Sequence, residues 1–384
     1  MVYYLVGGAV RDILLGKHPT EFDLAFDGTA DEFLREHGGR VQTVGKKTAV
    51  YIVAGREHSA LVNGNLADDL ANRDLTINAL AMDENGILHA LPQTFADLTD
   101  GILRHASLNS FTNDYARVLR AARFTATLEG FFIHPETLAL MRKAASEQGY
   151  GEFAAERAGK ECMKAFGGYR PGNFLRALAE AEALLPWFPP LAEACLVPAG
   201  PSEYHGNSTV FDHTCNVMDA VAYAQYTKNL PEKERALAVW MALCHDFGKI
   251  ETDPEKWPHH IGHESRGLYA AESLAASLRL PAQWIKAARI AISLHMKAGQ
   301  YRKLQRKKRV DMLHTLNVSG LFVPFYAMIT ADSHDETLAA TMQNDMRAML
   351  AVSLPEKWRD KGEESAKRLR ELRIAALPRK YSAP

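Results

Sequence analysis

The chain has few cysteines, no long apolar run and almost no net charge, and each shortage excludes a class of protein. Four cysteines in 384 residues (Cys162, Cys195, Cys215 and Cys244) lie far apart without a CxxC motif, which argues against a zinc ribbon or a disulfide framework. No apolar run approaches the ~18–20 residues that span a bilayer, and the N-terminus lacks the pattern of a signal peptide. We therefore expect a reduced, cytoplasmic protein with no membrane partner.

The net charge of −1, from 45 basic and 46 acidic residues, neither demands nor excludes nucleic acid. A local basic stripe can bind phosphates on a neutral protein. The basic residues are concentrated in two places, a helical stripe and a dense run: Arg117, Arg120 and Arg123, and Arg302, Lys303, Arg306, Lys307, Lys308 and Arg309. The run fits a phosphate-backbone contact and a solvated charged helix about equally well.

Apolar periodicity divides the chain into a mixed part and a helical part. At ~150 residues per domain, the length predicts two to three domains. Helical spacing dominates from Asp114, with proline-rich interruptions at 186–190 and 198–206 that we interpret as a linker. We expect an α+β chain with a small α/β head, a helical neck and a C-terminal helical domain. The head combines one helical pattern with several strand-like runs, at 9–15 and at 3–6, 22–26, 50–53 and 59–62.

A phosphate-binding and metal-binding pattern occupies the first strands. The first strand ends in Gly7-Gly8, which lets a phosphate approach the backbone, and Arg11 lies one turn into the following helix. Glu21 and Asp23 are two residues apart, so on a strand they point to the same face. Two carboxylates on one face are costly without a cation, and Mg²⁺ bridging them to a triphosphate is the usual solution.

Four motifs in order carry a resemblance to a known family. Residues 5–12 (LVGGAVRD), 21–23 (EFD), 73–81 (RDLTINALA) and 114–124 (DYARVLRAARF) resemble the class II tRNA nucleotidyltransferases. These are the CCA-adding enzymes of the DNA polymerase β-like superfamily. The resemblance implies four parts: a nucleotidyltransferase head, a helical neck for nucleotide recognition and RNA binding, an HD phosphohydrolase-like domain and a helical tail, at 1–112, 113–200, 205–340 and 341–384.

The resemblance also implies a role for each motif. Glu21 and Asp23 would be the catalytic residues, holding Mg²⁺ that activates the RNA 3′-hydroxyl and neutralises the triphosphate. The nucleotide would be held by Gly8, Arg11 and Arg73, with further contacts from Arg120 and Arg123. The expected partners are tRNA, CTP and ATP.

Asp114 and Arg117 match the pair that reads the base in this family. Their i,i+3 spacing puts them on one helix face. The carboxylate can accept from the amino group of cytosine or adenine, while the guanidinium donates to ring acceptors. Guanine and uracil have a carbonyl at that position, which would face the carboxylate with lone pair against lone pair.

A second constellation lies in the helical part. His213, the His245-Asp246 pair and Asp332 resemble the HD phosphohydrolase pattern around a divalent metal, with Ni²⁺, Mn²⁺ or Mg²⁺ as candidates. Such a site activates water and clamps a phosphate, so the resemblance implies a phosphodiesterase or phosphatase. Lys249 would help to hold the phosphate. Four further histidines could enlarge the site, the latter two being better placed: His259, His260, His263 and His295.

Three departures from the family pattern keep alternatives open. Glu21 stands where the family has aspartate, and Asn113 where it usually has glutamate. The connection to Arg73 is also short, because residues 63–72 run directly into the motif. Loss of the flexible loop found there in relatives is associated with CC-adding enzymes, which stop before the terminal A.

The main prediction is therefore Mg²⁺-dependent, template-independent addition of C and A to tRNA 3′ ends, with a possible hydrolase in the HD domain. Three alternatives remain: CC addition only, poly(A) polymerisation, and a degenerate head that binds RNA beside a catalytic HD domain. Asp23, Asp114 and Arg117 argue against the last, since a pure binder needs neither a metal-binding acid nor a base-reading pair.

Overall fold

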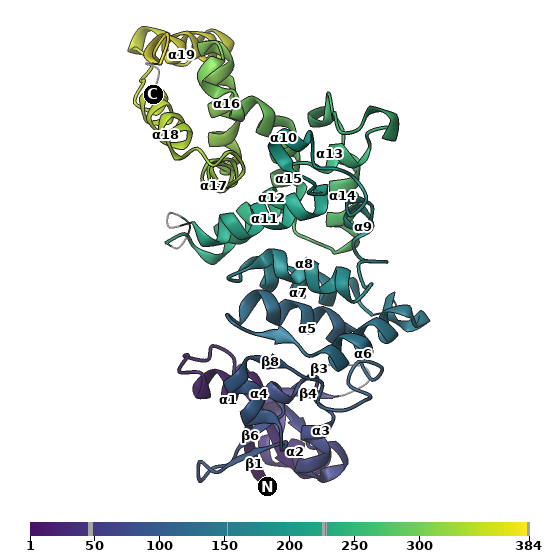
Figure 1. Cartoon of the computed structure of the whole chain (residues 1–384). Coiled ribbons are helices and arrows are strands. Elements are labelled where there is room, and N and C mark those ends of the chain that lie inside the picture. Colours follow the sequence, from purple (N-terminus) through teal and green to yellow (C-terminus); the bar gives the residue numbers. More distant parts are fainter. Residues whose placement is uncertain (45–48, 152, 225–226, 228, 382–384) are drawn as a thin grey trace. The chain divides into compact units, whose positions relative to one another are not determined.

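The structure is a computed structural model, and it describes residues 1–44, 49–151, 153–224, 227 and 229–381 (Figure 1). Its contacts divide the chain into two compact units. Unit 1 is Met1–Phe153 with Ala177–Ala183, and unit 2 is Ala154–Arg176 with Leu184–Pro384. Among the described residues, no helix is long and apolar enough to cross a membrane.

Unit 1 is built on a seven-stranded mixed sheet of order β3-β4-β5-β2-β1-β6-β7. Strands β2 and β5 pair in parallel, and the other neighbours are antiparallel. Successive residues of a strand face opposite sides, so Ala25 and Phe26 belong to different apolar clusters, one with Val6 and Leu70 and the other with Phe33. The strands are β1 (Val2–Val6), β2 (Asp23–Asp27), β3 (Gln42–Val44), β4 (Val50–Val53), β5 (Arg56–Ala60), β6 (Leu80–Met82) and β7 (Leu88–Ala90).

The central strand pair fixes the place of the first motif. Val6 is paired with Asp23 across the antiparallel β1 and β2, and with Ala81 on β6. The amide of Gly7 then donates to the Leu80 carbonyl at 2.9 Å, just before helix α1 begins. The two-glycine end of β1 therefore lies beside the first residue of β2.

The rest of unit 1 is mainly helical. Helix α2 begins with a capping box between Thr29 and Glu32. A short parallel pair, β8 with β9, flanks helix α5 in the chain. The elements are α1 (Gly8–Leu14), α2 (Ala30–His37), η1 (Gly38–Arg40), η2 (Val62–Gly64), α3 (Leu66–Ala71), η3 (Thr76–Asn78), α4 (Thr94–Asp100), β8 (Ile102–Leu103), α5 (Ala116–Thr127), β9 (Phe132–Ile133), α6 (Pro135–Ser146) and η4 (Gln148–Gly151).

The second half of the chain is helical (Figure 1), and α12 lies at the core of unit 2, against α7, α11, α15 and α17. Residues 236–244 of α12 are all buried, as expected for a helix apolar on every side. The elements are α7 (Ala155–Phe166), α8 (Pro171–Glu180), α9 (Pro189–Ala194), α10 (Ser202–His205), α11 (Val210–Tyr223), α12 (Glu232–Cys244), α13 (Phe247–Ile250), η5 (Pro254–Lys256), η6 (His263–Ser265), α14 (Leu268–Ser277), α15 (Ala282–Gly299), η7 (Tyr301–Lys303), α16 (Arg306–Ser319), α17 (Phe322–Ser333), α18 (Glu336–Leu350), η8 (Glu356–Trp358) and α19 (Glu363–Ala376).

The predicted mixed head and helical remainder are confirmed, with two local corrections. Strand β5 runs over Arg56–Ala60 rather than 59–62, because Ala54 and Gly55 both have positive φ and close a two-residue hairpin turn. Residues 198–206 are not a free linker. The Ala199 amide donates to the Ser208 carbonyl at 2.9 Å, and Ala199 is fully buried.

Candidate active sites

The end of β1 places two guanidinium groups beside the backbone. Gly7 has φ +70°, and a Cβ atom there would lie 2.8 Å from Nη1 of Arg73. A Cβ atom on Gly8 would lie 3.4 Å from Nη2 of Arg11. The positive φ of Gly7 favours glycine at this position, and Nη1 of Arg73 occupies the space that a Cβ atom would need. The predicted nucleotide-binding residues Gly8, Arg11 and Arg73 meet at one place.

Arg11 is buried and held by three different groups. Its Nη1 donates to Oδ1 of Asn78 at 2.6 Å, and its Nη2 donates to Oδ1 of Asp12 at 2.7 Å. The guanidinium also lies over the ring of Phe124, 5.0 Å from the centroid. These contacts fix the cation in one orientation.

Asp74 connects Arg11 to the helix α5. Nδ2 of Asn78 donates to Oδ1 of Asp74 at 3.0 Å, and Arg120 pairs with Oδ2 at 3.3 Å. Burial raises the pKa of Asp74, but Arg120, Asn78 and Arg117 outweigh burial and hold the pKa below its ordinary value. Asp74 is therefore a buried carboxylate that orders the cations around it.

Arg73 is held by a separate carboxylate. Its Nη2 donates to Oδ2 of Asp69 at 2.8 Å, and Asp69 is buried on helix α3. The i,i+4 spacing of the two residues is the one that brings side chains together across a helical turn. The short connection that precedes Arg73 thus supplies its partner.

Asp114 and Arg117 lie at the start of α5. Oδ1 of Asp114 accepts from the Ala116 amide at 3.1 Å, and Nη1 of Arg117 donates to the Ser110 carbonyl at 3.0 Å. Burial lowers the pKa of Arg117 from its usual value, while Asp74 and Asp114 act in the opposite sense. Farther along α5, Arg123 lies 4.1 Å from the centroid of the Phe124 ring, which Arg11 also contacts.

The two predicted catalytic carboxylates lie at the start of β2, and both are exposed. Asp23 is the first residue of the strand, whereas Glu21 precedes it. The expectation that both sit on one strand face is therefore wrong, because regular pairing begins only at Asp23. Carboxylate oxygens are the ligands that Mg²⁺ prefers, and exposure leaves room for the water and phosphate oxygens it keeps. This donor set fits the ion.

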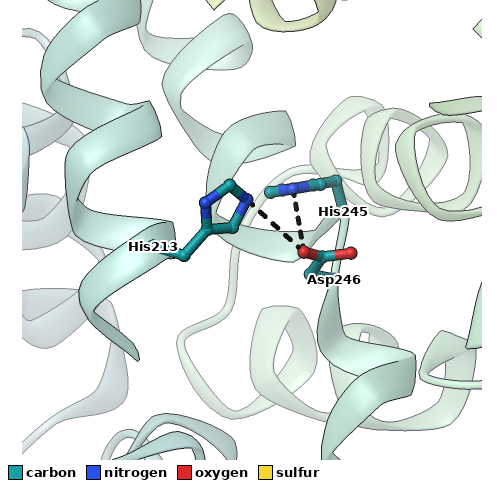
Figure 2. Close-up of side chains that lie close together, drawn as sticks. All are labelled: His213, His245 and Asp246. Carbon is teal, nitrogen blue, oxygen red and sulfur yellow. Dashed lines mark ion pairs between the residues drawn. The ribbon is translucent and has the colours of Figure 1, made fainter. Parts of the chain in front are cut away.

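In unit 2, three helical segments bring His213, His245, Asp246 and Asp332 together. Nε2 of His213 lies 3.5 Å from Oδ2 of Asp246, and Nε2 of His245 lies 3.3 Å from the same oxygen (Figure 2). Oδ1 of Asp332 lies 3.3 Å from His213 Nε2 and 3.5 Å from His245 Nε2. Residues separated by more than 110 positions thus present two nitrogens and two carboxylates to one point.

The surroundings of His245 show whether a metal ion would fit at this point. Its Nδ1 lies 2.7 Å from the Ala242 carbonyl, so that nitrogen carries the proton. Its Nε2 is buried and makes no hydrogen bond of acceptable geometry. A buried nitrogen lone pair directed at two carboxylates fits a divalent cation, and the backbone carbonyl fixes the tautomer as in known metal sites.

The pKa shifts of His245 and Asp246 also favour a bound cation. Burial lowers the pKa of His245, but Asp246 and Asp332 outweigh it and raise that pKa well above its ordinary value. Burial raises the pKa of Asp246, but His245 and Lys249 hold it well below the usual range. A divalent cation at this point would supply the positive charge that the two carboxylates favour on His245.

Lys249 and the neighbouring histidines have distinct positions. Nζ of Lys249 contacts Oδ2 of Asp246 at 2.7 Å and donates to the Ala199 carbonyl at 2.8 Å. His260 contacts the Pro198 carbonyl at 2.8 Å, and His259 is exposed. Residues 198–199, interpreted from sequence as linker, therefore help to hold Lys249 and His260.

Three contacts were not anticipated from the sequence: Asn78 with Arg11, Asp69 with Arg73, and Ala199 with Lys249. The i,i+4 spacing of Asp69 and Arg73 was a signal that could have been used. The other two join residues at least 50 positions apart, and only the tertiary structure reveals them.

Comparison with known proteins finds a matching family model in part of each unit. Residues 3–58 match the Poly A polymerase head domain, and residues 210–318 match the HD domain. The chain is 32% identical to a multifunctional CCA protein of Alkalilimnicola ehrlichii over 358 residues, covering 87% of this chain and 84% of that one. It is 36% identical to the multifunctional CCA protein of Tolumonas auensis over 304 residues, covering 73% and 71%.

Solved structures show the same fold. The CCA-adding enzyme of Thermotoga maritima, in complex with tRNA, has a TM-score of 0.68 at 21% identity, covering 100% of this chain and 88% of that one. A CCA-adding enzyme with ATP has a TM-score of 0.67 at 20% identity, covering 99% and 87%.

Fold and family matches thus define a nucleotidyltransferase with a Poly A polymerase-type head domain and an HD domain. The chain belongs to the family of multifunctional CCA proteins, and the resemblance found in the sequence is confirmed.

Proposed function

We propose that the chain adds C and A nucleotides from CTP and ATP to the 3′ end of tRNA, in the cytoplasm. The observation that carries this proposal is the convergence of Arg11 and Arg73 on Gly7 and Gly8, beside Asp23 at the start of β2. The named relatives are multifunctional CCA proteins, and structural neighbours bind tRNA, ATP and CTP.

The proposed mechanism assigns each group one task. Glu21 and Asp23 would hold Mg²⁺, which supplies charge neutralisation at the triphosphate and activation of the attacking hydroxyl. Arg11 and Arg73 bind and orient the triphosphate through fixed guanidinium groups. Asp114 and Arg117 select the base, the first as acceptor and the second as donor.

The test is nucleotide incorporation by an Asp23→Ala variant. We expect nucleotide addition to fall by more than about 1,000-fold, because the metal ligand acts directly on the transferring phosphoryl group. Asp31→Ala is the matched control, since Asp31 is also an exposed carboxylate of unit 1 but lies on α2. Full activity of Asp23→Ala would favour a head that only binds RNA.

We propose in addition that the HD domain, over residues 205–340, is a metal-dependent phosphohydrolase. His213, His245, Asp246 and Asp332 would hold a divalent ion, with Ni²⁺, Mn²⁺ or Mg²⁺ as the candidates, and the ion would polarise a phosphate and activate water. Hydrolysis of 2′,3′-cyclic AMP and p-nitrophenyl phosphate should be abolished by His213→Ala. His259→Ala, which changes an exposed histidine, should retain full activity. Equal activity of the two variants would contradict the assignment.

A specific observation favours CC addition as a second candidate function. The connection between β5 and Arg73 is filled by η2 and α3, and Asp69 of α3 is paired with Arg73. Relatives have a flexible loop in this connection, and its loss is associated with enzymes that stop after two C residues. A tRNA ending in CC separates the candidates: incorporation of A supports CCA addition, and its absence supports CC addition.

A further inference from the structure

We propose that Ser110 is a positioning residue that determines base specificity, because it joins Arg117, the proposed base reader, to Arg73, which binds the triphosphate. The inference deepens the nucleotidyltransferase function proposed above and rests on it. It adds a residue that lies outside the sequence motifs, since Ser110 falls between the motifs at 73–81 and 114–124.

Ser110 is fully buried, and its hydroxyl and carbonyl groups bond to different partners. Its Oγ donates to the Arg73 carbonyl at 3.1 Å and accepts from the Ser107 amide at 3.0 Å. Its own carbonyl accepts from Nη1 of Arg117 at 3.0 Å. One residue therefore contacts both the main chain of the triphosphate-binding arginine and the side chain of the base-reading arginine.

The backbone that leads to Ser110 is itself fixed against the residues that follow Arg73. Residues 74–76 and 104–106 run antiparallel and are joined by backbone hydrogen bonds of 2.8 and 3.1 Å. Ser110 lies beyond this pairing, and its hydroxyl supplies the bond to the next carbonyl, that of Arg73. The Ser110 carbonyl is therefore held at a defined place relative to Arg73.

A second contact joins the same two segments. Nδ2 of Asn113 donates to Oδ1 of Asn72 at 3.1 Å. Asn72 directly precedes Arg73, and Asn113 directly precedes Asp114, the other member of the proposed base-reading pair. The residues before helix α5 are thus tied to Arg73 at two points, so the base-reading pair and Arg73 move together.

The electrostatics around Arg117 explain why its guanidinium needs a fixed acceptor. Burial lowers the pKa of Arg117, and the positive charges of Arg120 and Arg73 act in the same direction, which means that these cations repel it. A guanidinium carries its five N–H donors in one rigid plane, so a hydrogen bond from Nη1 orients the whole group. The Ser110 carbonyl supplies this bond and opposes the repulsion.

A fixed orientation of Arg117 provides selection against uracil. Where cytosine has a ring nitrogen that accepts, uracil has an N–H group that donates. A guanidinium held in one orientation donates to the cytosine acceptor and opposes the uracil donor, whereas a guanidinium that is free to turn avoids the mismatch. Loss of the Ser110 hydroxyl should therefore lower discrimination between CTP and UTP.

An alternative explanation is that Ser110 only stabilises the local fold. In that case Ser110→Ala would lower the free energy of unfolding and would reduce kcat/KM for CTP and for UTP by the same factor. The ratio of the two kcat/KM values would then stay at the parent value, so this ratio separates positioning from stability.

The experiment measures kcat/KM for CTP and UTP with the full chain, Mg²⁺ and a tRNA that lacks CCA. We expect Ser110→Ala to lower the CTP-to-UTP ratio by about 3–10-fold, the range of one neutral hydrogen bond. Ser110→Cys keeps the size of the side chain but is a poor hydrogen-bonding group, so it should give a similar fall even if the alanine variant does not fold. Ser107→Ala is the matched control and should preserve the ratio, because Ser107 enters the turn through its backbone amide and carbonyl.

A double-mutant cycle tests whether Ser110 acts through Arg117. Arg117→Ala should lower the ratio, and adding Ser110→Ala should lower it no further, because the group that Ser110 positions is gone. A preserved ratio in Ser110→Cys, or a further fall in the double variant, would overturn the inference while leaving the proposed function in place. An unchanged ratio in Arg117→Ala would instead contradict the proposed base-reading role and the inference with it.

Discussion

Arg11 and Asn78 are 67 positions apart, yet Nη1 of Arg11 donates to Oδ1 of Asn78 at 2.6 Å in the interior of unit 1. Asn78 also donates to Asp74, which pairs with Arg120 of α5. The amide therefore ties a guanidinium at the end of β1 to the helix that carries the proposed base-reading pair.

We expect Asn78→Ala to impair binding of the nucleoside triphosphate. A hydrogen bond to a charged group contributes about 1.5–3 kcal/mol, so kcat/KM for CTP should fall by about 10–100-fold. Steady-state incorporation of CTP into tRNA measures this, with Asn85→Ala as the control on an exposed turn. An unchanged kcat/KM would show that Arg11 does not depend on Asn78 for its position.

Asp114→Ala should relax selection against UTP. The carboxylate accepts from the amino group of cytosine and repels the carbonyl of uracil, and such base contacts discriminate by about 1–3 kcal/mol. The ratio of kcat/KM for CTP to that for UTP should therefore fall by about 10–100-fold. Asp100→Ala, at the exposed end of α4, should preserve the ratio. A preserved ratio in Asp114→Ala itself would remove this residue from base selection.

The basic run at 302–309 divides into a structural and an exposed part. Arg309 is buried and paired with Asp345 at 2.9 Å, and it also bonds Tyr381 and the Pro378 carbonyl. Part of the run is therefore not available to phosphates. Lys307 and Lys308 are exposed and remain candidates for RNA contact.

Substitutions in this run should separate folding from binding. Arg309→Ala breaks a buried ion pair and should lower the free energy of unfolding by about 3–5 kcal/mol, measured in urea. Charge reversal of Lys307 and Lys308 should leave unfolding unchanged and weaken tRNA binding at low salt. If that double variant binds tRNA normally at low salt, the exposed lysines do not contact the backbone.

Asp74 should make the stability of unit 1 depend on pH. Its pKa in the folded chain lies below its ordinary value of 3.8, so the unfolded chain takes up a proton first as pH falls. The stabilisation is fully present above about pH 5 and is lost as pH falls through the ordinary pKa toward the folded one. Urea unfolding across this range should show a steeper loss in the parent chain than in Asp74→Asn. Equal slopes would mean that Asp74 does not titrate as its contacts require.

Local patterns in the sequence predicted the structural features that depend on residues close together in the chain. The strand ending at Gly7-Gly8, the helical stripe of Arg117, Arg120 and Arg123, and the adjacent His245-Asp246 pair all follow from short-range spacing. Their surroundings could not be predicted in the same way. The burial of Arg309 depends on Asp345 and on the C-terminal residues that pack against it, and Glu21 lies outside β2 because strand pairing starts at Asp23.

The most direct test of the account is the 3′-terminal sequence formed on a tRNA that lacks CCA, with CTP, ATP and Mg²⁺ present. Products should end in CCA in the parent chain and remain unextended with Asp23→Ala. Products that stop at CC would contradict CCA addition and support CC addition, the second candidate function. An unextended tRNA with the parent chain would contradict the proposal that the head is a nucleotidyltransferase.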